Sequence, residues 1–239
     1  MFQHIFKKQK INSSVDTDAE SLRKAEQVAQ FREHYHKIIN TVTSLLEKTP
    51  DTDNENDKEL MLEYIINSLL DYACSEAIVK PLYNDHENLP RPFPIRFYDE
   101  DSERLDFDIQ KRTTVDLAST KIYVWPWNNS RTQNSIIRIS KEKFVFFENN
   151  HRAIYYPDIN LCYVHNGNHS INAGRYFKKG SIAADEYDLT KGFKHISTDG
   201  AYWYNSHTGE ELEPTQDFRF AAVFTIAKMK YDITHPNNK

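Results

Sequence analysis

Prolines occupy every second position from Pro90 to Pro94, between two parts of the chain whose apolar residues follow different periods. A proline fixes its own φ and disfavours the helical conformation for the residue before it, so this segment must be extended. Any helix that precedes it must end before Pro90. The prolines therefore divide the chain into a helical part and a part with a different secondary structure.

The part before the prolines has helical periodicity. Apolar residues three and four positions apart mark one face of a helix from about Ala19 to Lys48, and a second such pattern runs from about Lys58 to Leu82. The polar, acidic connector 49–57 separates them. The pair predicts an antiparallel helical hairpin whose helices pack on each other and on the rest of the protein. The alternative is an arm for a protein partner or for self-association.

Short segments rich in β-branched and aromatic residues follow from Lys121 onward. The expected elements are strands at 122–125, 144–147, 153–156 and 160–164, helices at 170–179 and from about Thr215, and a β-hairpin around 202–204. The segment 133–140 is expected to be a short helix, with a further strand as the alternative. The predicted fold class is α+β, with the N-terminal helical hairpin followed by a mixed sheet and packed helices. The expected domains are a hairpin region 1–88, a proline-rich and acidic linker 89–118 and an α+β domain 119–239.

Composition restricts the class of protein. The content of 39% hydrophobic and 13% aromatic residues is that of a globular chain. No apolar run reaches the roughly 20 residues of a membrane-spanning helix, and the N-terminus lacks a secretory pattern. We therefore expect a cytoplasmic protein with no membrane contact. Cys74 and Cys162 are far apart in apolar segments, so we expect buried thiols rather than a disulfide or a metal site.

Charge is distributed unevenly although the formal net charge is only -5. Residues 50–110 hold 16 acidic and 5 basic side chains, whereas residues 119–180 hold 9 basic and 3 acidic ones. The net charge argues against indiscriminate binding of nucleic acid by the whole chain. The basic region, however, is a candidate surface for phosphate groups.

The loop Asn166-Gly167-Asn168-His169-Ser170 lies inside this basic region, between an apolar strand and a predicted helix. The first N–H groups of a helix have no intrahelical acceptor, and the helix dipole adds positive potential there, so such a junction can bind an anion. Gly167 permits positive φ or close approach of a ligand. His169 can donate to a phosphate or move a proton near neutral pH. The alternative is an ordinary Asn-Gly turn capped by Ser170.

The strand, the turn 166–169 and the following helix resemble the ParB/sulfiredoxin superfamily, whose signature is an acidic residue or Gly, then Gly, a variable residue, His and Arg. The upstream segment 122–131 is similar to that superfamily's first strand, which leads to an Asn and Arg pair, here Asn128 and Arg131. The resemblance covers residues 119–185 and implies binding of nucleoside triphosphates or DNA, with hydrolysis in some members. The chain also looks like an uncharacterised bacterial family with a Gly-Asn-His-Ser turn and a Trp-Pro-Trp segment.

By position, the resemblance makes Gly167 the turn glycine and His169 the phosphate-contacting histidine. Asn168 stands where sulfiredoxin has its nucleophilic Cys, which excludes sulfiredoxin chemistry. Ser170 stands where the phosphate-binding Arg is expected, so a bidentate ligand is missing. The candidates for the missing positive charge are Arg131, Arg175 and Lys178.

The first functional hypothesis is therefore binding of a nucleotide or nucleic-acid phosphate, and the sequence leaves hydrolysis of the ligand open. The catalytic candidates are His169 and Asn168, and the ligand-binding candidates are Asn166, Gly167, Ser170, Arg131, Asn128, Arg175 and Lys178. The alternative is a non-enzymatic interaction or regulatory factor that uses the helical hairpin and the aromatic C-terminal region. No cofactor is identified, and we expect no metal site because no histidine pair has the spacing of a known metal motif.

Overall fold

The structure, a computed structural model, describes residues 13–49, 55–84, 89–107 and 109–236. The expectation about a secretory pattern concerns residues outside these ranges, and so do residues 50–54 of the polar connector. Within the described residues, two long helices come first, and strands with further helices between and after them follow. The structure confirms the α+β class and the helical N-terminal region followed by a sheet.

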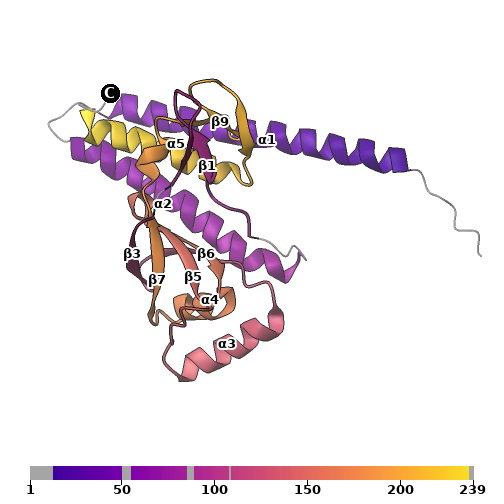
Figure 1. Cartoon of the computed structure of the whole chain (residues 1–239), viewed down its shortest axis with the longest axis vertical. Coiled ribbons are helices and arrows are strands. Elements are labelled where there is room, and N and C mark those ends of the chain that lie inside the picture. Colours follow the sequence, from indigo (N-terminus) through magenta and orange to yellow (C-terminus); the bar gives the residue numbers. More distant parts are fainter. Residues whose placement is uncertain (1–12, 50–54, 85–88, 108, 237–239) are drawn as a thin grey trace, which may run out of the picture.

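A mixed sheet lies at the centre of the fold (Figure 1). Its strands are β3 (Ile109–Asp116), β4 (Lys121–Tyr123), β5 (Arg152–Tyr156), β6 (Leu161–Asn166) and β7 (Ser181–Tyr187), in the order β3-β7-β5-β6-β4. The pairs β4–β6 and β5–β7 are parallel, whereas β3–β7 and β5–β6 are antiparallel. The sheet is mixed, as the sequence predicts.

Strand β6 is apolar at consecutive positions because both faces of the sheet are covered. Leu161 and Tyr163 belong to a core shared with α2 (Glu55–Val79) and α5 (Phe218–Thr234). Cys162 and Val164 point to the other face, where α4 (Asn168–Tyr176) covers the sheet. Side chains of a strand alternate between faces, so a continuous apolar run is typical of a strand buried on both sides.

The two N-terminal helices form as predicted, but their packing differs from a simple hairpin. Helix α1 spans Ser13–Lys48, and α2 is followed by the 3-10 turn η1 (Lys80–Leu82). Figure 1 shows α1 and α2 diverging, with α5 beside both, and α5 is the main packing partner of each. The expected direct pairing is therefore wrong. The apolar faces of α1 and α2 pack on a C-terminal helix that no local pattern in the hairpin could reveal.

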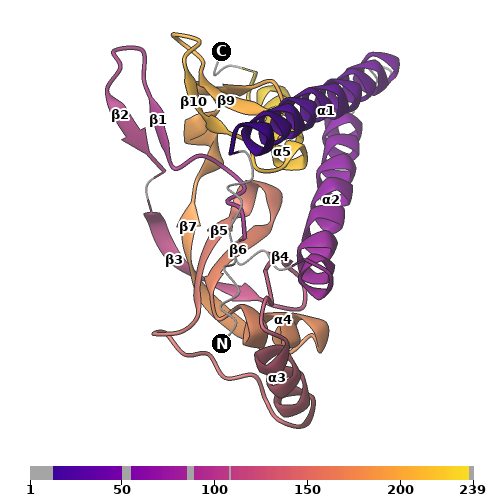
Figure 2. The ribbon, with the colours of Figure 1, turned by 90° about the vertical axis from the view of Figure 1, so that its right-hand side faces the viewer.

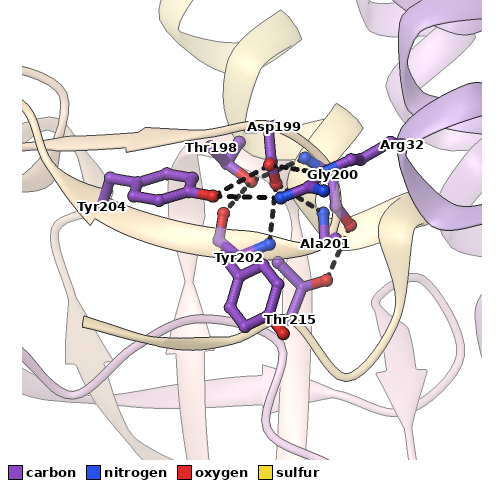
Figure 3. A network of polar contacts seen from close by, with 8 residues as sticks. All are labelled: Arg32, Thr198, Asp199, Gly200, Ala201, Tyr202, Tyr204 and Thr215. Carbon is purple, nitrogen blue, oxygen red and sulfur yellow. Dashed lines mark hydrogen bonds and ion pairs between the residues drawn. The ribbon is translucent and has the colours of Figure 1, made fainter. Parts of the chain in front are cut away.

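The C-terminal meander packs on α1 through the turn between β8 (Ile196–Thr198) and β9 (Tyr202–Asn205), to which β10 (Glu211–Pro214) adds a third strand. Figure 3 shows this turn: Asp199 Oδ1 accepts from the N–H groups of Ala201 and Tyr202, both at 2.9 Å. Gly200 has φ 91°, and a Cβ there would lie 2.3 Å from Cβ of Tyr35 in α1. A glycine is therefore required at this contact.

The region expected to be a linker, 89–118, is instead part of the folded structure. It contains β1 (Arg96–Tyr98), β2 (Arg104–Asp106) and the sheet strand β3. Phe93 is buried in the core against Tyr156 and Phe220. The prolines keep the segment extended, as predicted. Because this extended segment buries the ring of Phe93, it is part of the core and does not act as a linker between two domains.

The expected strand at 144–147 is absent, although its residue types favour one. Phe144, Phe146 and Phe147 all contact the His151 ring, while Val145 and Phe147 are partly exposed to solvent. The aromatic residues here therefore surround a buried histidine without strand pairing. Helix α3 (Asn129–Lys141) is longer than the expected 133–140, and the remaining short turns are η2 (Pro157–Ile159) and η3 (Leu189–Gly192).

Both cysteines are buried, as expected, and burial raises the pKa of Cys74 to about 12. None of the helices in the described ranges has the length and apolar character needed to cross a membrane.

Candidate functional site

The junction between β6 and α4 lies at the end of the molecule occupied by α3 (Figure 1). Gly167 ends the strand with φ 83° and precedes the first turn of α4. A Cβ at this position would lie 2.4 Å from Cδ2 of His151, closer than any real side chain tolerates. Glycine is required here for its backbone conformation and for the close approach of His151. Gly167 provides no side-chain cap, so the first N–H groups of α4 are placed where an anion can accept from them.

A buried chain of hydrogen bonds fixes this turn. The N–H of Phe147 donates to Nδ1 of His151 at 3.0 Å, so the proton of the neutral ring is on Nε2. Nε2 lies 2.9 Å from Oγ of Ser170, which in turn donates to the carbonyl oxygen of Gly167 at 3.1 Å. His151 is 1% exposed. The predicted ligand Ser170 therefore uses its hydroxyl inside the protein, as a structural group of the turn.

The sequence gives no reason to select His151, because this residue lies outside every motif. Burial lowers the pKa of His151, and the charge of Arg138 lowers it further. The ring is thus kept neutral near pH 7, which is the state that can accept from Phe147 and donate to Ser170.

His169 lies in the first turn of α4 and is partly exposed. Its Nδ1 is 3.2 Å from Oγ1 of Thr132, whose hydroxyl donates to the carbonyl oxygen of Pro126 at 3.3 Å. The tautomer that satisfies both contacts carries its proton on Nδ1 and leaves Nε2 without one. Burial lowers the pKa of His169, and Arg131 lowers it further. The indole of Trp127 meets the imidazole edge-on, with ring centroids 5.5 Å apart.

Asn168, the other catalytic candidate, has a structural role. Its Oδ1 accepts from the N–H of Trp125 at 3.0 Å, which connects the end of β4 to the start of α4. Asn168 also lines the cavity described next. The amide therefore orients the helix that carries His169.

A cavity of about 320 Å³ lies between α3 and the first turn of α4. We call it the α3–α4 cavity, and its lining is Trp127, Arg131, Asn134, Ser135, Arg138, Asn150 and residues 166–170. Arg131 and Arg138 are two turns apart on one face of α3, and Arg131 also packs over Trp127 at 5.7 Å. Two arginines therefore line the same cavity as the positive end of α4.

Arg138 is a residue that the sequence interpretation missed. The signal was present, since Arg131, Ser135 and Arg138 are spaced four and three apart and fall on one face once residue 129 is recognised as the start of α3.

The structure brings Arg131 and residues 166–170 together but leaves three predicted ligands outside the cavity. Asn128 caps α3, where its Oδ1 accepts from the N–H of Arg131 at 2.9 Å. Arg175 lies near the other end of α4, where its charge acts on Cys74 of α2. Lys178 is exposed beyond the last residue of α4. Residues that are close in sequence move apart along a helix by about 1.5 Å per residue, so the far end of α4 lies away from the cavity.

A second hollow of about 470 Å³ adjoins the α3–α4 cavity and shares Trp127 and Asn168 with it. Arg91, Tyr163 and His165 also line it. Within the described ranges, no group of three or more His, Cys, Asp or Glu side chains is placed to hold a metal ion.

The fold and the site thus define an α+β protein with a basic cavity at a strand-to-helix junction. The model of a protein family of unknown function, DUF6710, matches residues 6–237, and the chain belongs to this family. A search of curated proteins and a search of solved structures found no match.

Proposed function

We propose that the protein binds a phosphate group of a nucleotide or a nucleic acid in the α3–α4 cavity. The observation that carries this proposal is the position of Arg131 and Arg138, which line the same cavity as the first turn of α4. A guanidinium can bind a phosphate through two parallel hydrogen bonds, and the N-terminal N–H groups of a helix favour negative charge.

The same arrangement offers a substitute for the arginine that the ParB/sulfiredoxin signature expects at residue 170. Ser170 occupies the position of that arginine and is engaged with His151 and Gly167. The arginines of α3 offer guanidinium groups from the opposite wall of the cavity. Phosphate recognition by such a protein would then rest on α3 as well as on the Gly-X-His turn.

His169 is the group best suited to proton transfer in this cavity. Its lowered pKa and its contact with Thr132 favour a neutral ring with Nε2 free to accept a proton. Hydrolysis of a bound phosphoester would use Nε2 to take a proton from the attacking water. Phosphate binding requires no such step, so binding and hydrolysis are measured separately.

Titration calorimetry and thermal shift test the proposal with inorganic phosphate, pyrophosphate, a panel of nucleoside triphosphates and short single- and double-stranded oligonucleotides. A ligand that binds the folded state raises the melting temperature. Loss of a charged hydrogen bond costs about 1.5–3 kcal/mol, so Arg138→Ala and Arg131→Ala should each weaken binding roughly 10- to 100-fold.

Lys141→Ala is the matched control, because it removes one positive charge from the exposed end of α3 outside the cavity. Its affinity should stay close to that of the unchanged protein. Binding by none of these ligands, or binding that both arginine variants retain in full, would refute the proposal.

A second candidate function is a non-enzymatic interaction factor. The observation that favours it is an exposed apolar face on α2, which lies away from the α3–α4 cavity and is independent of phosphate binding.

A further inference from the structure

Helix α2 has a second apolar face that the described part of the chain leaves exposed. Its inner face packs in the core through residues such as Leu62, Ile66 and Leu70. The exposed large apolar side chains of α2 and the turn that follows it are Leu60, Tyr64, Tyr72, Val79, Leu82 and Tyr83. At about 3.6 residues per turn, Leu60, Tyr64 and Val79 fall on the side of the helix opposite the buried residues. Tyr72 lies at the edge of that side, where its ring packs under the guanidinium of Arg219 at 4.6 Å. A helix that is apolar on both sides is typical of one covered on both sides.

The size of this outer α2 face argues for a specific interface. The six side chains are between 50% and 73% exposed. The three tyrosines offer roughly 150–250 Å² each when fully exposed and the three aliphatic side chains less, so at these exposures the six offer on the order of 600 Å². The largest apolar patch of a typical monomer is about 300–600 Å², and specific interfaces begin at about 600 Å² on each partner. The outer α2 face therefore reaches the lower end of the area that a stable dimer buries.

We infer that a second copy of this chain covers the outer α2 face, with the two α2 helices packed antiparallel about a two-fold axis between Asp71 and Tyr72. This register places Tyr64 of one copy opposite Val79 of the other, and Leu60 beside the turn that follows α2 of the other copy. Ser68 lies opposite Ser75, where small side chains let the helices approach closely. A two-fold interface must be self-complementary, and the order of large, small and large residues along α2 satisfies this requirement.

The polar groups on the outer α2 face do not oppose burial. Asp71 forms an ion pair with Lys121, so its charge is already compensated. Oγ of Ser68 donates to the carbonyl oxygen of Tyr64 at 2.8 Å. The register also sets the Tyr72 hydroxyl of one copy opposite Asp71 of the other, a donor facing an acceptor. Hydrogen-bonded polar groups can be buried at little cost.

The outer α2 face is accessible to a second copy. Figure 2 shows α2 at the edge of the molecule, with the sheet and α5 on its inner side and no element covering the length of its outer side. Antiparallel helices packed at an interaxial distance of about 8–10 Å need only such an unobstructed side.

The first experiment measures the molar mass of the full chain by light scattering and sedimentation. The chain should be a dimer, and Tyr64→Lys and Val79→Lys should each shift it towards monomer, since a charge would be buried at the interface. Tyr176→Lys, at an equally exposed apolar residue on α4, should leave the dimer unchanged. The melting temperature of each variant shows that the fold is retained. A monomer at all concentrations up to about 100 μM, well above dissociation constants typical of such interfaces, would overturn the inference.

The second experiment tests the register by disulfide trapping. Ser68→Cys and Ser75→Cys chains, mixed and oxidised, should form a cross-linked heterodimer, because these positions face each other across the axis. Neither variant should cross-link alone, since like positions are about 10 Å apart along the helix axis in this register. The buried thiols Cys74 and Cys162 do not compete. Cross-linking of Ser68→Cys with itself would indicate parallel helices and overturn the antiparallel register.

Discussion

Nε of Arg32 in α1 donates to Oδ2 of Asp199 at 2.6 Å, which joins the N-terminal helix to the C-terminal meander (Figure 3). Tyr204 donates to the same oxygen at 2.9 Å, while the other carboxylate oxygen accepts from the turn backbone. Burial alone would raise the pKa of Asp199, but these hydrogen bonds lower it. The carboxylate therefore holds the turn in shape and fixes it to α1.

Asp199→Ala should lower the free energy of unfolding by roughly 2–3 kcal/mol, because it leaves several donors without an acceptor. Arg32→Ala should cost less, about 1 kcal/mol, since Arg32 is half exposed and its partner keeps its other donors. Urea denaturation measures both. The control is Arg104→Ala in the exposed pair with Asp106, expected to change stability by less than about 0.5 kcal/mol. Equal effects of Asp199→Ala and the control would contradict the assigned role.

Ser170→Ala should destabilise the protein by about 1–3 kcal/mol, because Nε2 of buried His151 then has no acceptor at 2.9 Å. Urea denaturation again gives the value. Ser140→Ala is a matched control, since Oγ of Ser140 donates to the carbonyl oxygen of Ile137 on the exposed side of α3. If both substitutions had the same small effect, Ser170 would be free to contact a ligand after all.

Gly167→Ala and Gly209→Ala separate backbone strain from steric contact. Both glycines have positive φ, at 83° and 74°. A Cβ at residue 209 meets no atom within 4 Å, whereas one at residue 167 would meet His151. Gly209→Ala should cost about 1 kcal/mol, the usual strain of a non-glycine residue in this region, and Gly167→Ala should cost clearly more. Thermal unfolding of both variants side by side decides the matter, and equal costs would argue against the contact.

Stability should fall as the pH decreases below about 6.5. The pKa values of His151 and His169 are lowered in the folded protein, chiefly by burial. The unfolded chain therefore binds protons first as the pH falls, which favours unfolding until the folded-state pKa is passed. Denaturation at pH 7.5 and at pH 5.5 measures the difference. His151→Asn should reduce the pH dependence, because the ring that resists protonation is removed; an unchanged dependence would rule out His151 as its source.

The sequence predicted the elements whose periodicity is local. The apolar spacing of α1 and α2, the run that forms β6 and the turn at Gly167 all appear where expected. Pairing across long distances was not predictable: the prolines and the acidic run indicate a linker at 89–118, whereas β3 (Ile109–Asp116) within it is mostly exposed and pairs with the distant strand β7. The site shows the same difference. The loop 166–170 is one continuous segment of the sequence, whereas Arg138 lines the cavity and His151 hydrogen-bonds to Ser170 only because the fold brings them there.

The contact between α2 and α5 sets an order of events during synthesis. The chain emerges from the ribosome with α2 about 140 residues ahead of α5, which at some 5–20 residues per second is a delay of roughly 10–30 s. Throughout that interval the part of the inner face of α2 that packs on α5 stays uncovered, and so does its outer face. Early pairing of nascent chains through α2 would protect the outer face while the inner face waits for α5, which would link assembly of the proposed dimer to folding.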